Sequence, residues 1–273
     1  MSGDRVGDLG PRIRTILIFV PIVLAAVFLG NWVFTLLVLL LAVGVAEEMG
    51  RLLPNREPVS MRPAQVAIIW LFVGTFIVSP IWLILTPFFL FLSGIGDWFK
   101  GDASWARRTS DLGWQVFTAC YAGLALWWVY LRFEPDGLVL FLFALAVTWF
   151  NDTVAYLGGS RFGRKRLVPA LSPKKSVEGA LFGLGAGGLV GLVFTGWLPL
   201  HPGVAIALGV ITAISAQLGD LFASMLKRGA EVKDTGALLP GHGGLLDRVD
   251  SLLFSVPVVL LLVRVYVILG GTL

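Results

Sequence analysis

The sequence predicts an all-α, polytopic integral membrane protein with about nine transmembrane helices, its N-terminus in the cytoplasm and its C-terminus outside. Apolar residues make up 57% of the chain and charged residues only 14%, whereas charged residues form about 25% of an ordinary soluble domain. The apolar residues are bunched into runs that approach or reach the roughly 17–25 residues needed to cross a bilayer. These runs lack the alternation typical of transmembrane barrel strands, so helices are the expected elements.

Each predicted span is an apolar segment that carries few charges. The third and fourth spans are separated only by Ser79 and Pro80, so they form either a tight hairpin or one broken segment. In order, the predicted spans are residues 13–29, 32–49, 65–79, 81–96, 113–131, 137–157, 179–198, 203–226 and 250–270.

The spans divide into two regions along the chain. An N-terminal transmembrane region of about five helices covers residues 1–136. It includes an interfacial segment near residues 97–112, where tryptophans are mixed with lysine and arginine, as is typical of headgroup depth. A C-terminal transmembrane region of about four helices covers residues 137–273, and with its two basic cytoplasmic loops it is the expected catalytic region.

Basic residues are almost confined to one side of the predicted membrane. All but Arg132 and Arg264 of the 21 lysines and arginines lie before or at the very start of the first span, or in the loops that follow the second, fourth, sixth and eighth spans. Cytoplasmic loops carry the excess of Lys and Arg, so these loops and the N-terminus are predicted to be cytoplasmic. An odd number of spans then puts the C-terminus outside. Topology alone, or attraction to anionic lipids, is the simpler explanation of the basic loops.

Two spans carry an acidic side chain near their predicted cytoplasmic ends: Asp152 in the sixth and Asp220 in the eighth. An acid inside a membrane costs roughly 2.5–3.5 kcal/mol on insertion scales, so it marks a functional site by default. Residues four and seven apart share a helix face, which aligns Asp220 with Ser224 and Lys227. By the same spacing, Asp152 is aligned with Tyr156.

Further acids stand at the ends of other spans. Asp247 and Asp250 are three residues apart at the predicted start of the last span, from where they can join the same pocket. Alternatively they only cap that helix, because acids interact favourably with a helix N-terminus. Glu47 and Glu48 end the second span and are predicted to form a solvated helix end.

The segment PGHGG, residues 240–244, precedes the last span. Glycines let backbone N–H groups approach a ligand closely, and the following helix start adds positive potential, a common means of holding phosphate. The Walker A pattern is absent. Cations and carboxylates flank the glycines, which suits a site where acids hold Mg²⁺ and cations neutralise phosphates. His242 is either a phosphate donor or a polar loop residue.

Two segments resemble the phosphatidate cytidylyltransferases, also called CDP-diglyceride synthases. The segment SMLKRGAEVKDTGALLPGHGGLLDRVDS is similar to the signature of that family. Its matching positions are Ser224, Lys227, Arg228, Lys233, Asp234, His242, Gly243, Gly244, Asp247, Arg248 and Asp250. A second segment, NDTVAYLGGSRFGRKRLVPALSPKKSVEG, resembles another region of the family, except that Ser176 stands where many members have threonine. The resemblance covers roughly residues 147–255.

The resemblance implies that CTP and phosphatidate react to give CDP-diacylglycerol and pyrophosphate in phospholipid biosynthesis, with Mg²⁺ and with or without a second cation. The phosphate of phosphatidate is already an anionic nucleophile, so catalysis would consist of positioning and charge neutralisation. It also implies a homodimer among membrane lipids with no nucleic-acid partner. The expected location is the inner (plasma) membrane of the cell, with the active site facing the cytoplasm.

Roles are assigned to the matching residues and to Asp220, the acid inside the eighth span. The expected metal ligands are Asp220 and Asp247, with Asp152 and Asp250 as weaker candidates. The expected catalytic residues are Asp220, Asp247, Lys227 and Arg248. The expected substrate-binding residues are Lys174, Lys175, Arg228, Lys233, His242, Gly243, Gly244, Ser224 and Tyr156.

Two other functions stay open from the residues. A CTP-dependent lipid kinase would share CTP, Mg²⁺ and the membrane, but it would transfer the γ-phosphate to an alcohol and release CDP. An ion or metabolite transporter also buries acids in helices, although its polar groups are expected near the membrane midplane. The acids here gather toward one face of the membrane, which favours the transferase.

Overall fold

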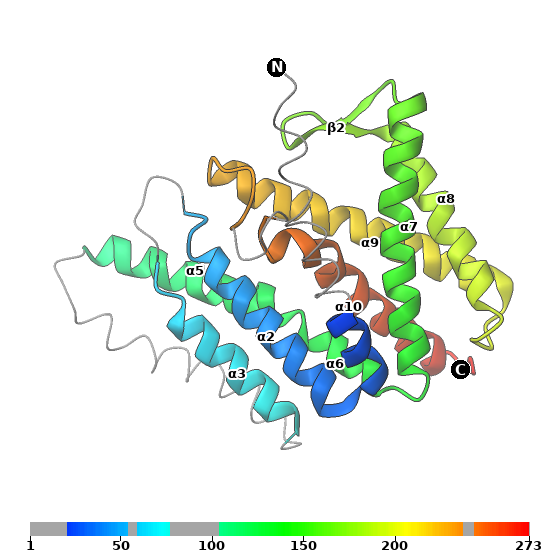
Figure 1. Ribbon diagram of the computed structural model, residues 1–273, viewed down its shortest axis with the longest axis horizontal. Helices are drawn as coiled ribbons and strands as arrows, with labels where there is room; N and C mark the ends of the chain where they lie inside the picture. The colour runs from blue at the N-terminus through cyan, green and yellow to red at the C-terminus, as the bar shows by residue number, and fades with distance from the viewer. Residues whose placement is uncertain (1–20, 54–58, 77–103, 237–242, 273) are drawn as a thin grey trace. The chain divides into compact units, whose positions relative to one another are not determined.

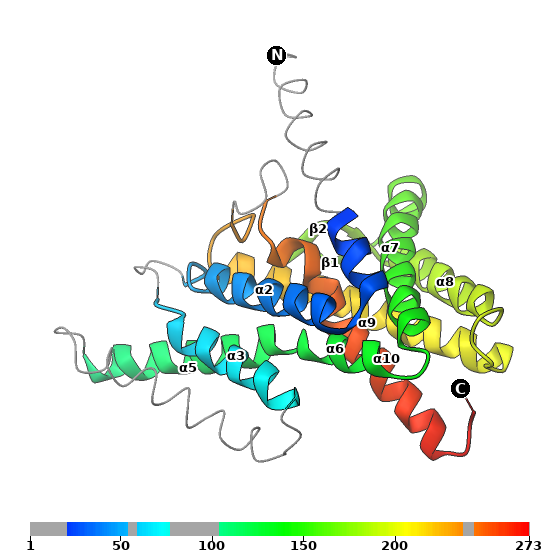
Figure 2. The ribbon, with the colours of Figure 1, turned by 60° about the horizontal axis from the view of Figure 1, so that its bottom comes forward.

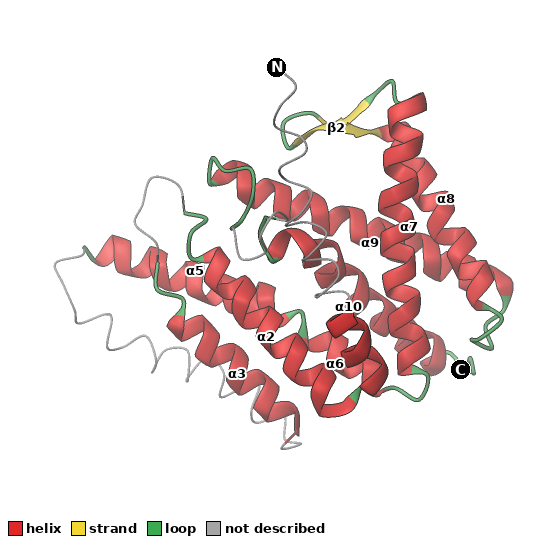
Figure 3. Ribbon diagram, in the orientation of Figure 1, coloured by secondary structure: helices red, strands yellow, loops and turns green. Residues whose placement is uncertain are grey.

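The computed structural model describes residues 21–53, 59–76, 104–236 and 243–272, which are mostly helical (Figures 1 and 3). In these residues, six helical stretches are long and apolar enough to cross a membrane. They are Trp32–Met49, Trp105–Phe133, Gly137–Phe162, Val177–Phe194, Pro202–Gly229 and Leu246–Ile268. Each overlaps one predicted span, and the protein is therefore an integral membrane protein.

Of the other three predicted spans, the structure describes the first and the third in part. Helix α3 (Arg62–Phe76) covers most of the third span but has 15 residues, fewer than the other spanning helices. Residues 21–29 of the first span are helical. The remainder of that span and the whole fourth span lie outside the described residues, as does most of the first half of the predicted interfacial segment.

The chain forms two compact units. The first unit comprises Met1–Leu126 and Gly229–Leu246. Its helices α2 (Asn31–Met49), α3 and α5 (Trp105–Gly123) pack on one another. Small residues form much of their shared core, namely Ala64, Ala67 and Ala119. Small side chains let transmembrane helices approach closely. Close van der Waals packing then holds the helices together, because the hydrophobic effect does not drive helices together within lipid.

The second unit comprises Trp127–Arg228 and Asp247–Leu273. Its helices are α6 (Leu126–Phe133), α7 (Gly137–Phe162), α8 (Val177–Phe194), α9 (Pro202–Gly229) and α10 (Leu246–Ile268). Helices α7 and α8 lie side by side in both views (Figures 1 and 2). Helices α8 and α9 approach each other so closely that their backbones are in contact. A Cβ added at Gly187 on α8 would lie only 2.7 Å from the carbonyl oxygen of Gly209 on α9.

A short hairpin connects α7 to α8. Strand β1 (Arg166–Val168) pairs antiparallel with β2 (Ser172–Ser176), with Arg166 opposite Ser176. The all-α prediction is therefore incomplete, since strands this short carry too few residues for alternation to reveal them. Helix α7 also continues to Phe162, beyond its predicted end at residue 157.

Ser176 joins the hairpin to α8. It is the last residue of β2 and the N-cap of α8, where its hydroxyl accepts a hydrogen bond from the Gly179 N–H at 3.1 Å. Serine and threonine both cap helices in this way. The serine found at this position therefore keeps the capping interaction that a threonine would make.

Candidate active site

A polar pocket of about 610 Å³ lies in the second unit, lined by α7, the hairpin and the facing parts of α8 and α9. Its lining includes side chains from two distant segments of the chain, all of which the sequence analysis assigned to one site. These are Asp152, Tyr156, Lys174, Lys175 and Asp220. The hairpin thus brings the lysines to the acids of the membrane-spanning helices.

Lys175 and Asp220 form an ion pair in this pocket. The lysine Nζ on β2 donates to Oδ2 of the aspartate on α9. Both side chains are partly exposed, at 29% and 30%, so the pair remains open to a ligand. The two residues are 45 positions apart in the chain, and the sequence analysis had placed Lys175 in a loop and Asp220 inside a span.

Asp220 also lies near two further carboxylates. Its charge repels those of Asp152 on α7 and Asp250 on α10. Asp152 is held by a chain of amides: Asn151 donates to it at 2.9 Å, and Gln217 donates to Asn151 at 2.7 Å. The structure therefore brings together acids of three helices that the sequence analysis had expected in one pocket.

A second ion pair lies where α9 ends and α10 begins. Lys227 Nζ donates to Asp247 Oδ1 at 2.6 Å, and both side chains are mostly buried. The charge of Lys227 also acts on Asp250, which is only 8% exposed. The Asp250 carboxylate accepts the N–H of Ser251 at 2.7 Å. Asp247 and Asp250 thus interact with other parts of the candidate site and do more than cap α10.

The cluster contains four carboxylates, those of Asp152, Asp220, Asp247 and Asp250. They are hard oxygen donors of the kind that Mg²⁺ prefers. In the part of the chain that the structure describes, no three Asp, Glu, His or Cys side chains are grouped tightly enough to hold one ion. Lys175 and Lys227 instead provide the cations that contact Asp220 and Asp247.

The remaining predicted residues fall in different places. Arg228 Nε donates to the Leu171 carbonyl at 3.4 Å, which ties the end of α9 to the hairpin turn. Ser224 is half-buried on α9, and Arg248 is exposed on α10. Lys233, Gly243 and Gly244 belong to the first unit. His242 lies outside the described residues.

Glu48 is a residue that the sequence interpretation missed. The solvated helix end holds for Glu47, which is exposed, but it is wrong for Glu48, which is 1% exposed. Its carboxylate accepts hydrogen bonds from Thr235 Oγ1 at 2.8 Å, from the Leu245 N–H at 2.7 Å and from the Leu246 N–H at 2.9 Å. All of these groups are in the first unit, and they lie on both sides of the PGHGG segment.

Glycines make room for this carboxylate. A Cβ added at Gly236 or at Gly244 would lie 2.7 Å from an oxygen of Glu48. Glu48 therefore anchors the two flanks of the PGHGG segment to α2. No local pattern distinguishes Glu48 from Glu47, because its partners are 187, 197 and 198 residues further along the chain.

The chain belongs to the cytidylyltransferase family, whose sequence profile matches residues 10–266. It is similar to proteins named phosphatidate cytidylyltransferase. It is 45% identical over 134 residues to the one from Synechocystis sp., covering 48% of this chain and 45% of the relative. It is 39% identical over 149 residues to those from Staphylococcus aureus strain COL and Staphylococcus epidermidis, covering 54% of this chain and 57% of each relative. The chain thus spans about half the length of the curated relatives it matches.

Proposed function

We propose that the protein is a phosphatidate cytidylyltransferase, which converts CTP and phosphatidate into CDP-diacylglycerol and pyrophosphate. The observation that carries this proposal is the Lys175–Asp220 pair, set beside Asp152 in a polar pocket of a membrane protein of the cytidylyltransferase family. The names of the relatives support the same substrates. Neither a lipid kinase nor a transporter is favoured by these similarities.

The proposed reaction needs charge neutralisation more than proton transfer. A phosphate oxygen of phosphatidate attacks the α-phosphorus of CTP, the bond between the α- and β-phosphates breaks, and pyrophosphate leaves. Lys175 and Lys227 would move from their carboxylates to the phosphates as the substrates bind. Preorganised cations next to the reacting phosphates stabilise the charge that develops in the transition state. Lys174 lines the same pocket and would bind phosphate as well.

Asp220 and Asp247 are proposed to hold Mg²⁺, with Asp152 and Asp250 as further ligands. Their hard oxygen donors and the proximity of Asp220 to Asp152 and Asp250 support this choice. When bound, the ion, with or without a second cation, would supply positive charge beside the phosphates of CTP. Arg228, Lys233, Arg248 and the backbone of the PGHGG segment are proposed to bind further phosphate oxygens.

The proposed reaction is tested by product analysis in detergent micelles that contain phosphatidate, CTP and Mg²⁺. Pyrophosphate and CDP-diacylglycerol should appear together and only when all components are present. Release of CDP with phosphorylation of a lipid alcohol would instead identify a kinase. If CTP is not consumed by a folded, membrane-extracted protein, the transferase proposal is wrong.

We also propose about nine spans, with the N-terminus and active site on the cytoplasmic side of the inner membrane and the C-terminus outside. The catalytic groups would then belong to a C-terminal region of residues 137–273, following an N-terminal region of residues 1–136. The basic hairpin supports this orientation, since Lys174, Lys175 and Arg166 lie at the pocket. A homodimer is proposed from the family resemblance.

The orientation predicts the labelling of single cysteines in a Cys120→Ala background. Cysteines introduced by Lys174→Cys and Lys233→Cys should react with an impermeant maleimide only after the cells are permeabilised, because both positions are exposed and cytoplasmic. Thr272→Cys should react in intact cells. Labelling at position 174 from outside would contradict the topology and the cytoplasmic active site.

A further inference from the structure

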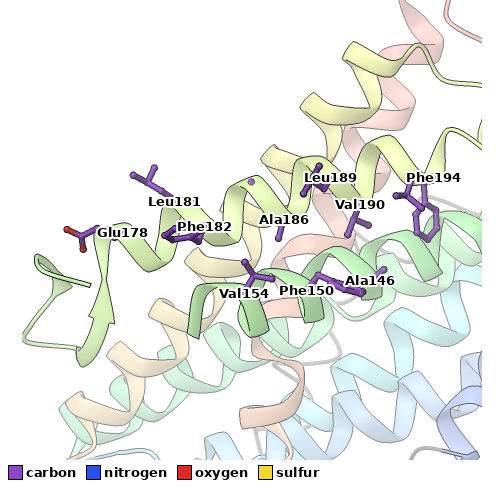
Figure 4. Close-up of a pocket in the computed structure, with 12 residues that line it drawn as sticks. Ala146, Phe150, Val154, Glu178, Leu181, Phe182, Ala186, Leu189, Val190 and Phe194 are labelled. Carbon is purple, nitrogen blue, oxygen red and sulfur yellow. The ribbon is translucent and has the colours of Figure 1, made fainter. Parts of the chain in front are cut away.

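An apolar groove of about 980 Å³ runs along helices α7 and α8 (Figure 4). It extends from Phe194 to Glu178, a distance of roughly 24 Å at 1.5 Å per helical residue. Among the described residues that line the groove, Glu178 alone carries a polar side chain. Several of the apolar side chains are strongly exposed, among them Leu181 at 62% and Leu189 at 66%. A groove of this length and polarity suits a hydrocarbon chain.

The groove has a charged end. Glu178 also lines a cavity of about 370 Å³ together with Arg161, Phe162 and Arg164. The Glu178 carboxylate accepts the backbone N–H groups of Arg164 at 3.0 Å and of Lys165 at 3.2 Å. The two guanidinium groups therefore outweigh the one carboxylate, and the cavity carries net positive charge. This charge suits a phosphate group.

Aromatic rings link the groove to this cavity. Phe182, which lines the groove, stacks on Phe162 with ring centroids 5.5 Å apart. The guanidinium of Arg161 lies over the Phe162 ring, with Cζ 5.9 Å from the centroid. An apolar surface thus leads directly to a cation, the order in which a phospholipid presents its chain and its phosphate.

The charged cavity also adjoins the candidate active site. Gly163 lines both the cavity and the polar pocket that contains Lys175 and Asp220. At the boundary between the cavity and the pocket, Gly163 packs closely on Ser176: a Cβ added at Gly163 would lie 2.7 Å from the Ser176 hydroxyl oxygen. A continuous series of lining residues therefore leads from the apolar groove through the arginines to the pocket.

We infer that the α7–α8 groove holds an acyl chain of the phosphatidate substrate, and that Arg161 and Arg164 guide its phosphate toward Lys175 and Asp220. This inference rests on the proposed function, because it names where the lipid substrate of that reaction binds. The net charge at one end of the groove and its continuity with the pocket favour a phosphate-bearing lipid over a second copy of the chain.

Gly185→Leu tests the groove. Gly185 lines it, and an added Cβ meets no atom within 4 Å, so a leucine enters the groove without displacing its neighbours. The KM for dioleoyl phosphatidate should rise about tenfold, because chain methylenes lose their place against the helices. The KM for CTP and the kinetics with dihexanoyl phosphatidate should stay within about twofold, because short chains need less of the groove.

Gly113→Leu is the matched control. Gly113 lies on α5 in the first unit, and an added Cβ there also meets no atom within 4 Å. The Gly113→Leu variant gains the same helix propensity as Gly185→Leu, and it should leave the KM for phosphatidate and for CTP unchanged.

The double variant Arg161→Gln/Arg164→Gln tests the charged cavity. It should raise the KM for long-chain and for short-chain phosphatidate alike, and it should leave the KM for CTP unchanged.

The outcomes separate this inference from the proposed function. If wild-type protein makes CDP-diacylglycerol and Gly185→Leu leaves the KM for dioleoyl phosphatidate unchanged, the groove is not the lipid site and the function stands. If that unchanged KM comes with loss of a dimer on size-exclusion chromatography, a second copy covers the groove. If wild-type protein makes no CDP-diacylglycerol at all, the function and the groove assignment fall together.

Discussion

Asp220→Asn should lower kcat for CDP-diacylglycerol formation by at least about a hundredfold, which corresponds to about 2.7 kcal/mol of transition-state stabilisation. The amide keeps the shape of the side chain but removes the charge that pairs with Lys175 and interacts with Asp152 and Asp250. An amide is also a poor ligand for Mg²⁺ compared with a carboxylate. Steady-state kinetics in detergent micelles at ordinary Mg²⁺ concentration measure the effect.

The matched control is Asp136→Asn. Asp136 precedes α7 in the same unit and makes no side-chain capping hydrogen bond there. Its replacement should leave kcat within about twofold, as expected for a substitution outside the site. Thermal unfolding of Asp220→Asn at the wild-type temperature would show that the loss is chemical. An Asp220→Asn protein with near-wild-type kcat would remove Asp220 from the proposed catalytic residues.

Glu48→Gln should destabilise the first unit by about 2–3 kcal/mol, because a buried charge-assisted hydrogen bond is lost and a buried N–H is left facing an amide donor. The carboxylate binds Thr235, Leu245 and Leu246 together, and the glutamine oxygen cannot serve all three donors equally. Thermal unfolding in detergent measures the change. Because Glu48 holds both flanks of the PGHGG segment, the protein that remains folded should also show a lower kcat/KM for CTP.

Glu47→Gln provides the comparison, since it makes the same change one residue earlier. Glu47 is exposed and accepts a hydrogen bond from Gln65 at 3.0 Å. Its replacement should change the free energy of unfolding by less than about 0.5 kcal/mol, as is usual for surface positions. Equal stability of the two variants would show that the buried hydrogen bonds of Glu48 do not hold the segment in place.

Local sequence patterns predicted the features that depend on local physics. Long apolar runs predicted the helices, and helical spacing placed Asp220 and Lys227 on one face of α9. Both lysine–aspartate pairs use residues that the sequence analysis had already assigned to the site: Asp220 from its place inside a span, and Lys175, Lys227 and Asp247 from the resemblance. The membrane itself makes these predictions reliable, because backbone groups in lipid must be paired within the helix.

Long-range contacts were not predictable in this way. The pairing of Lys175 with Asp220 depends on a hairpin of only three and five residues per strand, too short for a periodic signal. The burial of Glu48 depends on a segment nearly 200 residues later in the chain. In both cases the interaction partner belongs to another helix, strand or loop. The local sequence around Lys175 or Glu48 therefore does not indicate the partner.

The backbone contact between α8 and α9 bears on how such a protein can diverge. Gly187, Gly191 and Gly209 leave no space for any side chain at this contact, so substitution there would force the two helices apart. The opposite is true of Leu181 and Leu189, whose exposed side chains can change size without disturbing a neighbouring helix. With an acyl chain in the groove, as we infer, lipid preference could change by substitution on the groove side of α8 but not on the side that faces α9.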